Sequence, residues 1–254
     1  MSSIPKQARP TWPNSAAGDK LPEVPPVSNW RTTDQDEINR RRVRAAKEAM
    51  RFSNLTPEHP VFSNFSVASA SGQTYQVELR SLTPLVSACT CVDFCVNGLG
   101  TCKHVEGVLR WLRNEPLALG LAEEWGSARI DLVPDTATGR LMVERNVNLL
   151  PSALRGLFDI TGLALPDYSE QEILTAFEKA GRAALRVSQE VAAWSAQRQR
   201  NEERIRRRRD YEQQIRNGRY PAQETKLPLL PYQREGMLHL AFTERAMLAD
   251  EMGL

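Results

Sequence analysis

The alternation of apolar and polar residues predicts a short antiparallel sheet followed by a helix in the first half of the chain. Residues 61–67 alternate weakly, and Ser71-Gly72 then gives a turn signal. Between residues 75 and 80, apolar and polar side chains alternate at period two, as expected of a β-strand. After Cys102 the period becomes that of an amphipathic helix. Its apolar residues are Val105, Val108, Leu109 and Leu112.

The same reasoning predicts a second hairpin and a basic helix. Residues 128–133 and 140–144 flank a loop that contains Gly139, which indicates two strands joined by a turn. The acidic residues of this hairpin are expected to be solvated strand and turn residues rather than an acid/base pair. They are Asp131, Asp135 and Glu144. Residues 34–51 begin with acidic residues and then carry apolar residues at helical spacing, so we expect a helix there.

A long helix is predicted over residues 169–217. Ser169 and Glu172 have the spacing of a capping box, and Gly218 and Pro221 end the pattern. Apolar residues recur at intervals of three and four in its first half, which is typical of a packing seam. These residues are Ile173, Phe177, Ala180, Ala184, Val187, Val191 and Trp194.

Together these patterns predict an α+β fold with short antiparallel hairpins and one long basic helix. We divide the chain into a Pro-rich leader (1–33), a basic helix (34–58), a hairpin-plus-helix unit (59–115), a hairpin and helical connector (116–168), a helix that changes from amphipathic to basic (169–218) and a final segment (219–254). The leader is expected to be disordered, because it cannot bury enough apolar surface to offset its ordering entropy.

Composition narrows the class of protein. The chain has 254 residues, of which 41% are hydrophobic and 25% charged, as in ordinary globular proteins. No apolar run approaches the ~18 residues of a membrane span, so we expect no membrane association. The N-terminus lacks the apolar core of a secretory signal. We therefore predict a cytoplasmic protein, in which thiols stay reduced.

The net charge is only +2, so any basic surface must come from local clustering. One cluster lies in residues 34–51. The other lies between Arg198 and Arg219, where nine arginines accompany four acids. Its centre is Arg206, Arg207, Arg208 and Arg209. Each stretch is either a solvated helix face or a contact to phosphates. In the second stretch, a solvated helix would be laced with ion pairs such as Glu202–Arg206 and Glu203–Arg207.

Three of the four cysteines and a histidine form a CxC…CxH constellation. They are Cys89, Cys91, Cys102 and His104. Thiolates and imidazole are preferred ligands of zinc, and three sulfurs with one nitrogen complete a closed tetrahedral site. No position is left for water, so we expect structural rather than catalytic zinc. The first pair should lie on a strand or turn, and the second at a helix N-terminus, where the dipole favours thiolates.

These residues resemble the SWIM-type zinc finger over roughly residues 60–113. Asp93-Phe94 after the first pair, Lys103 between the last two ligands and the upstream hairpin belong to the same resemblance. It implies Zn²⁺ bound by Cys89, Cys91, Cys102 and His104, in a module that contacts DNA or protein. Cys95 has no counterpart in the family pattern, so we expect a spare thiol; the alternative is a competing ligand.

Residues 227–254 resemble the opening of the Swi/Snf-family helicase-like ATPase core. The resemblance is carried by Pro231 to Gly236 (PYQREG) and by Asp250 to Leu254 (DEMGL). It implies that Gln233 reads adenine and that Asp250 and Gly253 belong to an incomplete nucleotide site. An amide offers the donor and the acceptor that the adenine edge needs.

In that family, Gly-Lys-Thr follows and supplies the phosphate-binding lysine and the hydroxyl for magnesium. We therefore expect ATP and Mg²⁺ only in a complete parent protein, and we interpret this chain as a non-catalytic N-terminal fragment. Its strand from Ala246 to Ala249 would begin an incomplete α/β domain.

Two classes of function follow. In the first, the chain is the front end of a DNA-dependent ATPase, with DNA as the expected partner and a protein partner possible through the zinc finger. In the second, it is a stand-alone SWIM-type module that binds DNA or protein and has no motor. The coding sequence that follows Leu254 discriminates between them, because Gly-Lys-Thr is expected only in the first.

Overall fold

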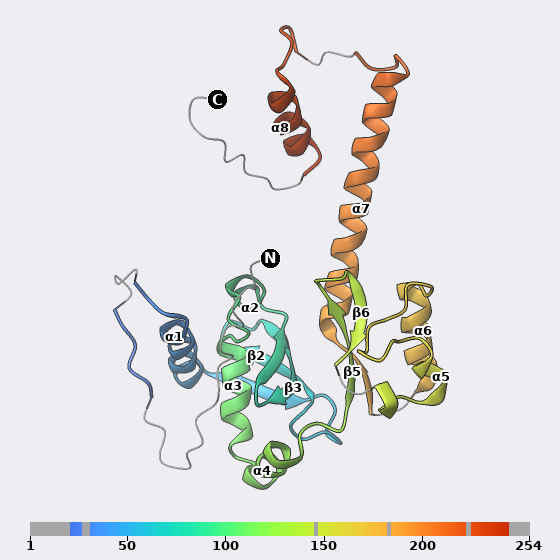
Figure 1. Cartoon of the computed structure of the whole chain (residues 1–254). Helices are drawn as coiled ribbons and strands as arrows, with labels where there is room; N and C mark the ends of the chain where they lie inside the picture. Colours follow the sequence, from blue (N-terminus) through green and yellow to red (C-terminus); the bar gives the residue numbers. More distant parts are fainter. Residues whose placement is uncertain (1–20, 27–30, 145–146, 182–183, 222–224, 244–254) are drawn as a thin grey trace. The chain divides into compact units, whose positions relative to one another are not determined.

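The computed structural model describes the chain except for residues 1–20, 27–30, 145–146, 182–183, 222–224 and 244–254. The described residues contain helices and two β-sheets joined by loops (Figure 1), which confirms the predicted α+β class. Two compact units can be separated, residues 1–190 and 191–254. No helix in the described ranges is both long enough and apolar enough to cross a bilayer.

The first sheet has four antiparallel strands in chain order. They are β1 (Met50–Asn54), β2 (Asn64–Ser69), β3 (Thr74–Leu82) and β4 (Leu85–Cys89). The predicted first hairpin is confirmed as β2 and β3, with Phe65 opposite Val77. The helix predicted over 34–51 is wrong at its end, since α1 spans only Asp34–Lys47. Met50 and Arg51 instead begin strand β1, which forms an antiparallel hydrogen-bonded ladder with β2.

One face of this sheet is covered by α3 (Lys103–Leu112), whose predicted apolar face is confirmed. The shared core comprises Phe65, Val67, Val77 and Leu79 from the sheet and Val105, Val108, Leu109 and Leu112 from the helix. Helix α3 approaches β1 closely at Gly107, where an added Cβ would lie 2.9 Å from the side chain of Met50. Two short helices flank α3: α2 (Val92–Asn97) and α4 (Pro116–Trp125).

The second sheet contains the predicted second hairpin. Strands β5 (Ile130–Asp135) and β6 (Arg140–Val143) are antiparallel, and β7 (Leu185–Val187) adds to β5 in parallel. The connection from β6 to β7 carries η1 (Val147–Leu149), α5 (Ser152–Arg155) and α6 (Glu170–Ala180). Buried Phe158, which follows α5, meets buried Phe177 of α6 edge to face. This contact packs α6 against the segment after α5.

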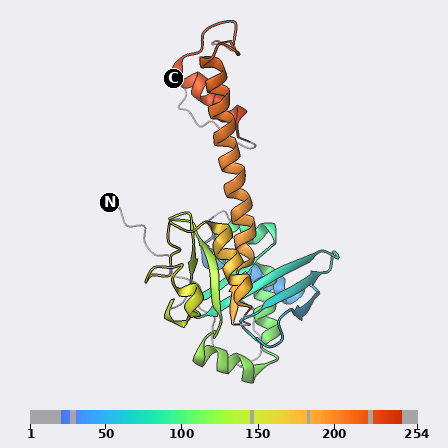
Figure 2. The ribbon, with the colours of Figure 1, turned by 90° about the vertical axis from the view of Figure 1, so that its right-hand side faces the viewer.

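The single helix predicted over residues 169–217 is wrong. The capping box of Ser169 and Glu172 is present, but α6 ends at Gly181, which adopts a left-handed conformation with φ 53°. A new helix, α7, runs from Gln189 to Arg216 and is drawn uninterrupted in Figure 2. The helical pattern fails between the two because residues 185–187 pair with β5, and pairing with a buried strand outweighs helix propensity there.

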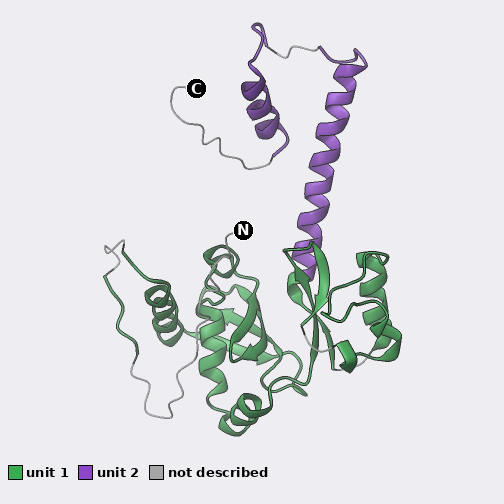
Figure 3. Ribbon diagram, viewed as in Figure 1, with its two compact units in different colours: residues 1–190 green, residues 191–254 purple. Residues whose placement is uncertain are grey.

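The second unit, coloured purple in Figure 3, contains α7 from Val191 onward and α8 (Pro231–Ala241). Arg208 of α7 donates a hydrogen bond to Glu235 of α8 at 2.6 Å. The ring of Tyr211 lies 5.6 Å from that of Phe242, which follows α8. These contacts hold the two helices of this unit together.

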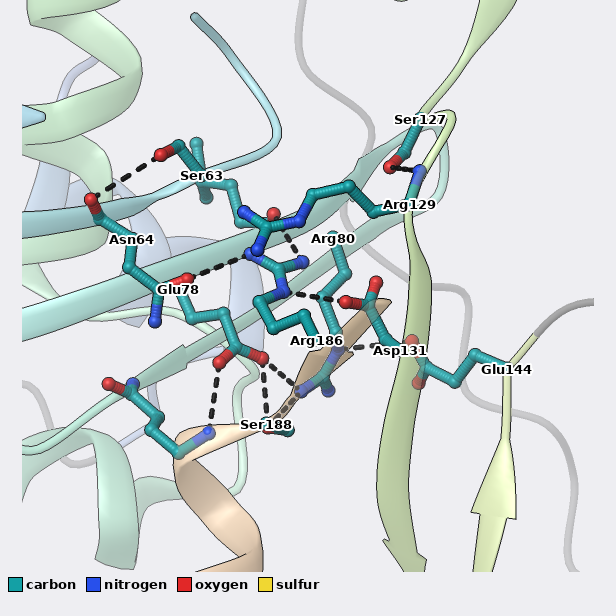
Figure 4. Close-up of polar contacts among 12 residues, drawn as sticks. Ser63, Asn64, Glu78, Arg80, Ser127, Arg129, Asp131, Glu144, Arg186 and Ser188 are labelled. Carbon is teal, nitrogen blue, oxygen red and sulfur yellow. Dashed lines mark hydrogen bonds and ion pairs between the residues drawn. The ribbon is translucent and has the colours of Figure 1, made fainter. Parts of the chain in front are cut away.

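A buried cluster of charged residues joins the two sheets of the first unit (Figure 4). Glu78 of β3 faces away from the apolar core and is 0% exposed. Its carboxylate accepts hydrogen bonds from Arg80 at 2.9 Å, from Ser188 at 2.8 Å and from the backbone N–H of Gln189 at 3.0 Å. The polar side of β3 is therefore buried against β7 and the first residue of α7.

The same cluster corrects the expectation that Asp131 is solvated, whereas Glu144 is exposed, as expected. Asp131 of β5 is buried and accepts from Nε of Arg186 at 2.6 Å. Partial burial raises the pKa of the Glu144 carboxyl, whose side chain is 30% exposed and which lies 3.1 Å from Nε of Arg80. Burial by itself would lower the pKa of Arg80, but the carboxylates of Glu190, Glu144 and Glu78 raise it, so this arginine stays charged.

Candidate metal centre

The structure brings together the four ligands that the sequence predicts. Their donor atoms all lie within 4.8 Å of one another, and all four residues are buried. Cys89 is the last residue of β4, and Cys91 is the N-cap of α2. Cys102 is the N-cap of α3, and His104 lies in its first turn. The expected positions, strand or turn for the first pair and helix N-terminus for the second, are confirmed.

The spacing of the donors suits a small ion. Nδ1 of His104 lies 3.8 Å from Sγ of Cys89 and 4.0 Å from Sγ of Cys102. A tetrahedral ion with bonds of about 2.3 Å to sulfur and about 2.0 Å to nitrogen separates such donors by roughly 3.6 Å. The measured distances are close to that value, so the cluster could hold a metal ion.

Electrostatics favour a cation among the three sulfurs. Contacts with the thiols of Cys89 and Cys91, together with burial, raise the pKa of Cys102. Hydrogen bonds from Cys102 and Cys89 lower the pKa of Cys91. One thiolate is thus stabilised at the expense of its neighbours, because several negative charges so close together repel one another. A bound divalent cation removes that conflict and allows all three to ionise.

The ten residues between Cys91 and Cys102 form an ordered connection. Sγ of Cys91 accepts from the backbone N–H of Phe94 at 3.3 Å, which caps α2. Asn97 then organises the turn that follows, because its side chain accepts from the N–H of Leu99 at 2.7 Å and donates to the carbonyl of Thr101 at 2.9 Å. The motif spacing therefore corresponds to a helical turn and a closed loop that return the chain to the cluster.

Cys95 lies outside the four-donor cluster. It is exposed, and its Sγ lies 3.8 Å from the carbonyl oxygen of Cys89. This position agrees with the expected spare thiol rather than with a competing ligand.

Tyr75 is a neighbour of the cluster that sequence reasoning did not identify as functional. Its ring stacks on that of His104 with centroids 4.2 Å apart. Within the described residues, the buried Nε2 of His104 has no hydrogen-bond partner. Metal-binding histidines are usually oriented by a hydrogen bond to the second ring nitrogen. In this structure the described contact of the imidazole ring is the stacked ring of Tyr75.

Two arginines of α1 form ion pairs with acids on the helices that carry the cluster. Arg41 binds Asp93 in a bidentate manner, with N···O distances of 3.0 and 2.6 Å. A neighbouring arginine, Arg42, lies 3.2 Å from Glu106, whose carboxyl pKa is raised by burial.

Lys103, between two ligands, pairs with Glu48 just after α1. For the stretch 34–51, the sequence left open a solvated face or phosphate contact. The structure shows a third arrangement, in which Asp93 and Glu106 of the metal-binding unit (residues 59–115) neutralise part of the positive charge of this stretch.

The arginines at the centre of α7 lie on a solvated helix. Of the two predicted ion pairs, Glu203–Arg207 is present at 2.8 Å. Arg206 pairs with Glu203 rather than with Glu202, which lies 3.6 Å from Arg198. The side chains of Arg206 and Arg207 are each 69% exposed.

The other two arginines of the group differ in their surroundings. Arg208 lies 3.1 Å from Glu212, in addition to its bond with Glu235, and is less exposed. Arg209 lies in the same exposed stretch of α7. Contact of this group with DNA stays a prediction.

The residues assigned to nucleotide binding are only partly described. Gln233 lies in the first turn of α8, where its side-chain oxygen accepts from the backbone N–H of Leu230 at 3.0 Å. Asp250, Gly253 and the strand predicted from Ala246 to Ala249 lie outside the described residues. The nucleotide site therefore stays a prediction.

Comparisons of this chain with models of known protein families, with curated proteins and with solved structures found no match. The function is therefore inferred from the residues and from the geometry of the cluster.

Proposed function

We propose that this chain is the zinc-binding N-terminal region of a Swi/Snf-type DNA-dependent ATPase, and that its SWIM-like zinc finger is structural. The observation that carries the proposal is the buried cluster of three sulfurs and one imidazole nitrogen. Soft thiolates with imidazole in a four-donor set favour zinc over harder cations. Because the protein supplies every donor, the ion has no free position for a substrate or for water.

The structural role is supported by how little apolar burial holds α2, between the two pairs of ligands. Helix α2 has no buried residue, and its Val92 and Val96 are exposed. Phe94 packs only partly against the core, and Asp93 is held from outside by Arg41. A zinc ion bound at both ends of this segment would tie β4, α2 and α3 together, so its binding energy would stabilise the fold directly.

The connection to an ATPase is supported by residues 227–254, whose PYQREG and DEMGL runs resemble the opening of the Swi/Snf core. ATP and Mg²⁺ are then cofactors of the complete parent protein. DNA is the proposed partner, with α7 as the contact. Exposure of Arg206 and Arg207 supports this choice, whereas Arg41 and Arg42 of α1 are engaged within the chain.

A stand-alone SWIM-type module is the second candidate. It is favoured by the first unit, residues 1–190, which contains the complete donor cluster and its own core. The coding sequence after Leu254 separates the two candidates, since Gly-Lys-Thr in the same frame supports the ATPase.

The zinc assignment is tested by elemental analysis of the chain purified in reducing buffer without added metal. We expect about one zinc ion per chain, as in a closed four-ligand site. Cys89→Ser and His104→Ala should lower that content, whereas Cys95→Ser, in the same segment but outside the cluster, should keep it. Metal-free parent protein, together with a His104→Ala variant that behaves like it, would refute the assignment.

A further inference from the structure

An apolar groove lies between α4 and the chain just before β2, away from the metal cluster. It encloses about 450 Å³. Its walls include Phe62 from the chain before β2 and Leu117, Leu121 and Trp125 from α4. Neither the proposed zinc site nor the proposed DNA contact uses this surface.

One wall of the groove is a ridge of large apolar side chains on α4. Leu117 is 78% exposed, Leu121 51% and Trp125 76%. Their spacing of four residues places them on one side of the helix, along about 12 Å of its length. The alanines at 118 and 122 pack towards the core instead. A continuous exposed ridge of this kind marks an interaction site more often than scattered apolar residues do.

The surroundings of the groove are acidic. Residues 55–62 and 114–128 contain four acids, whereas the nearest arginines lie at their ends: Arg129 is buried and donates to Thr56, and Arg113 is half-buried. The four acids are all exposed: Glu58, Glu115, Glu123 and Glu124. This charge repels nucleic-acid phosphates and attracts a basic protein segment.

We propose that this groove binds an amphipathic helix of a partner protein, with apolar residues facing α4 and Lys or Arg at its flanks. A straight ridge at four-residue spacing can interdigitate with the side-chain rows of a second helix. Helix-in-groove recognition of this kind uses a few apolar anchors at i, i+3, i+4 and i+7. The acidic flanks select the partner, and the apolar ridge supplies most of the affinity.

The test uses the full chain and a fluorescent helical peptide of about 14 residues, or four turns. The peptide carries Leu on one face and Lys at the flanks, and its control has Glu in place of each Lys. We expect saturable binding of the basic peptide by anisotropy, with Leu121→Gln raising Kd about tenfold, the usual effect of removing an anchor. Ile160→Ser, which removes a side chain that is 99% exposed and lies outside the groove, should leave Kd unchanged.

Three results of the peptide titrations would overturn the proposal: equal binding of the acidic peptide, an unchanged Kd in Leu121→Gln, or no binding of the basic peptide. A chain that sediments as a dimer and becomes monomeric in Leu121→Gln would also overturn it, because a second copy would then occupy the groove. The Leu121→Gln variant should keep the zinc content of the parent. Failure here is thus distinguishable from failure of the zinc assignment.

Discussion

His104 meets the cysteines through Nδ1, while the face of its ring lies on Tyr75. The ligands themselves are predictable from sequence, because the pairs 89/91 and 102/104 each have a spacing that strands, turns and helix termini accommodate. Tyr75 is not predictable in the same way. It lies on β3, and its position beside His104 depends on the register that places Val77 opposite Cys89.

At this scale we predict that Tyr75 positions the histidine ligand. Tyr75→Ala should weaken zinc binding about tenfold, the lower end of the effects seen when residues that orient a ligand are removed. Tyr75→Phe keeps the stacked ring and should bind zinc like the parent. Competition against a chromophoric chelator measures both affinities. An Ala variant with the parent's affinity would show that the stacking has no positioning role.

At the scale of elements, β3 has two different buried faces. Val77 and Leu79 pack against α3, whereas Glu78 and Arg80 are buried against the second sheet. The alternation of apolar and polar residues predicts the strand correctly, but it does not predict that the polar face is covered. A buried carboxylate is tolerated here because Arg80, Ser188 and the N–H of Gln189 satisfy it.

We therefore predict that Glu78 is essential to the joining of the two sheets. Glu78→Ala leaves Arg80 with fewer acceptors in a buried site and should lower the free energy of unfolding by about 3–5 kcal/mol. Glu123→Ala, at an exposed position on α4, should change it by less than about 0.5 kcal/mol. Urea denaturation measures both. Equal stability of the two variants would contradict this role.

The break between α6 and α7 is also decided at this scale. The recurrence of Ala184, Val187 and Val191 fits a continuous helix, whereas the spacing of Leu185 and Val187 fits a short strand. Gly181 is the signal that could have predicted the break, because an isolated glycine in a helical pattern can be a C-cap. Pairing with β5 decides the matter, and that contact links residues more than fifty positions apart.

At the scale of the whole molecule, the two basic stretches have different surroundings. Arg41 and Arg42 of α1 pair with acids near the metal cluster. The arginines of α7 mostly pair within their own helix, and two of them are highly exposed. Such surface pairs contribute little to stability and are readily exchanged for contacts with phosphates.

We predict that α7 contributes the main electrostatic contact with DNA. Replacing residues 206–209 by Gln should reduce the dependence of log Kd on log salt by up to about three to four for duplex DNA, at about 0.9 per phosphate contact. Replacing the same four residues by Lys keeps the charge and should keep most of that dependence. Anisotropy titrations across a salt series measure it. An unchanged slope in the Gln variant would exclude α7 as the contact.

The sequence by itself determined the α+β class, the two hairpins, the amphipathic face of α3 and the four metal-ligand candidates. These features depend on residues close together in the chain, where spacing alone predicts which side chains share a face. Only the tertiary structure decided that α1 pairs with the metal-binding unit, that the polar face of β3 is buried and that a strand separates α6 from α7. Each of these depends on contacts between distant segments, because burial and ion pairing are set by what packs against a residue rather than by its neighbours in sequence.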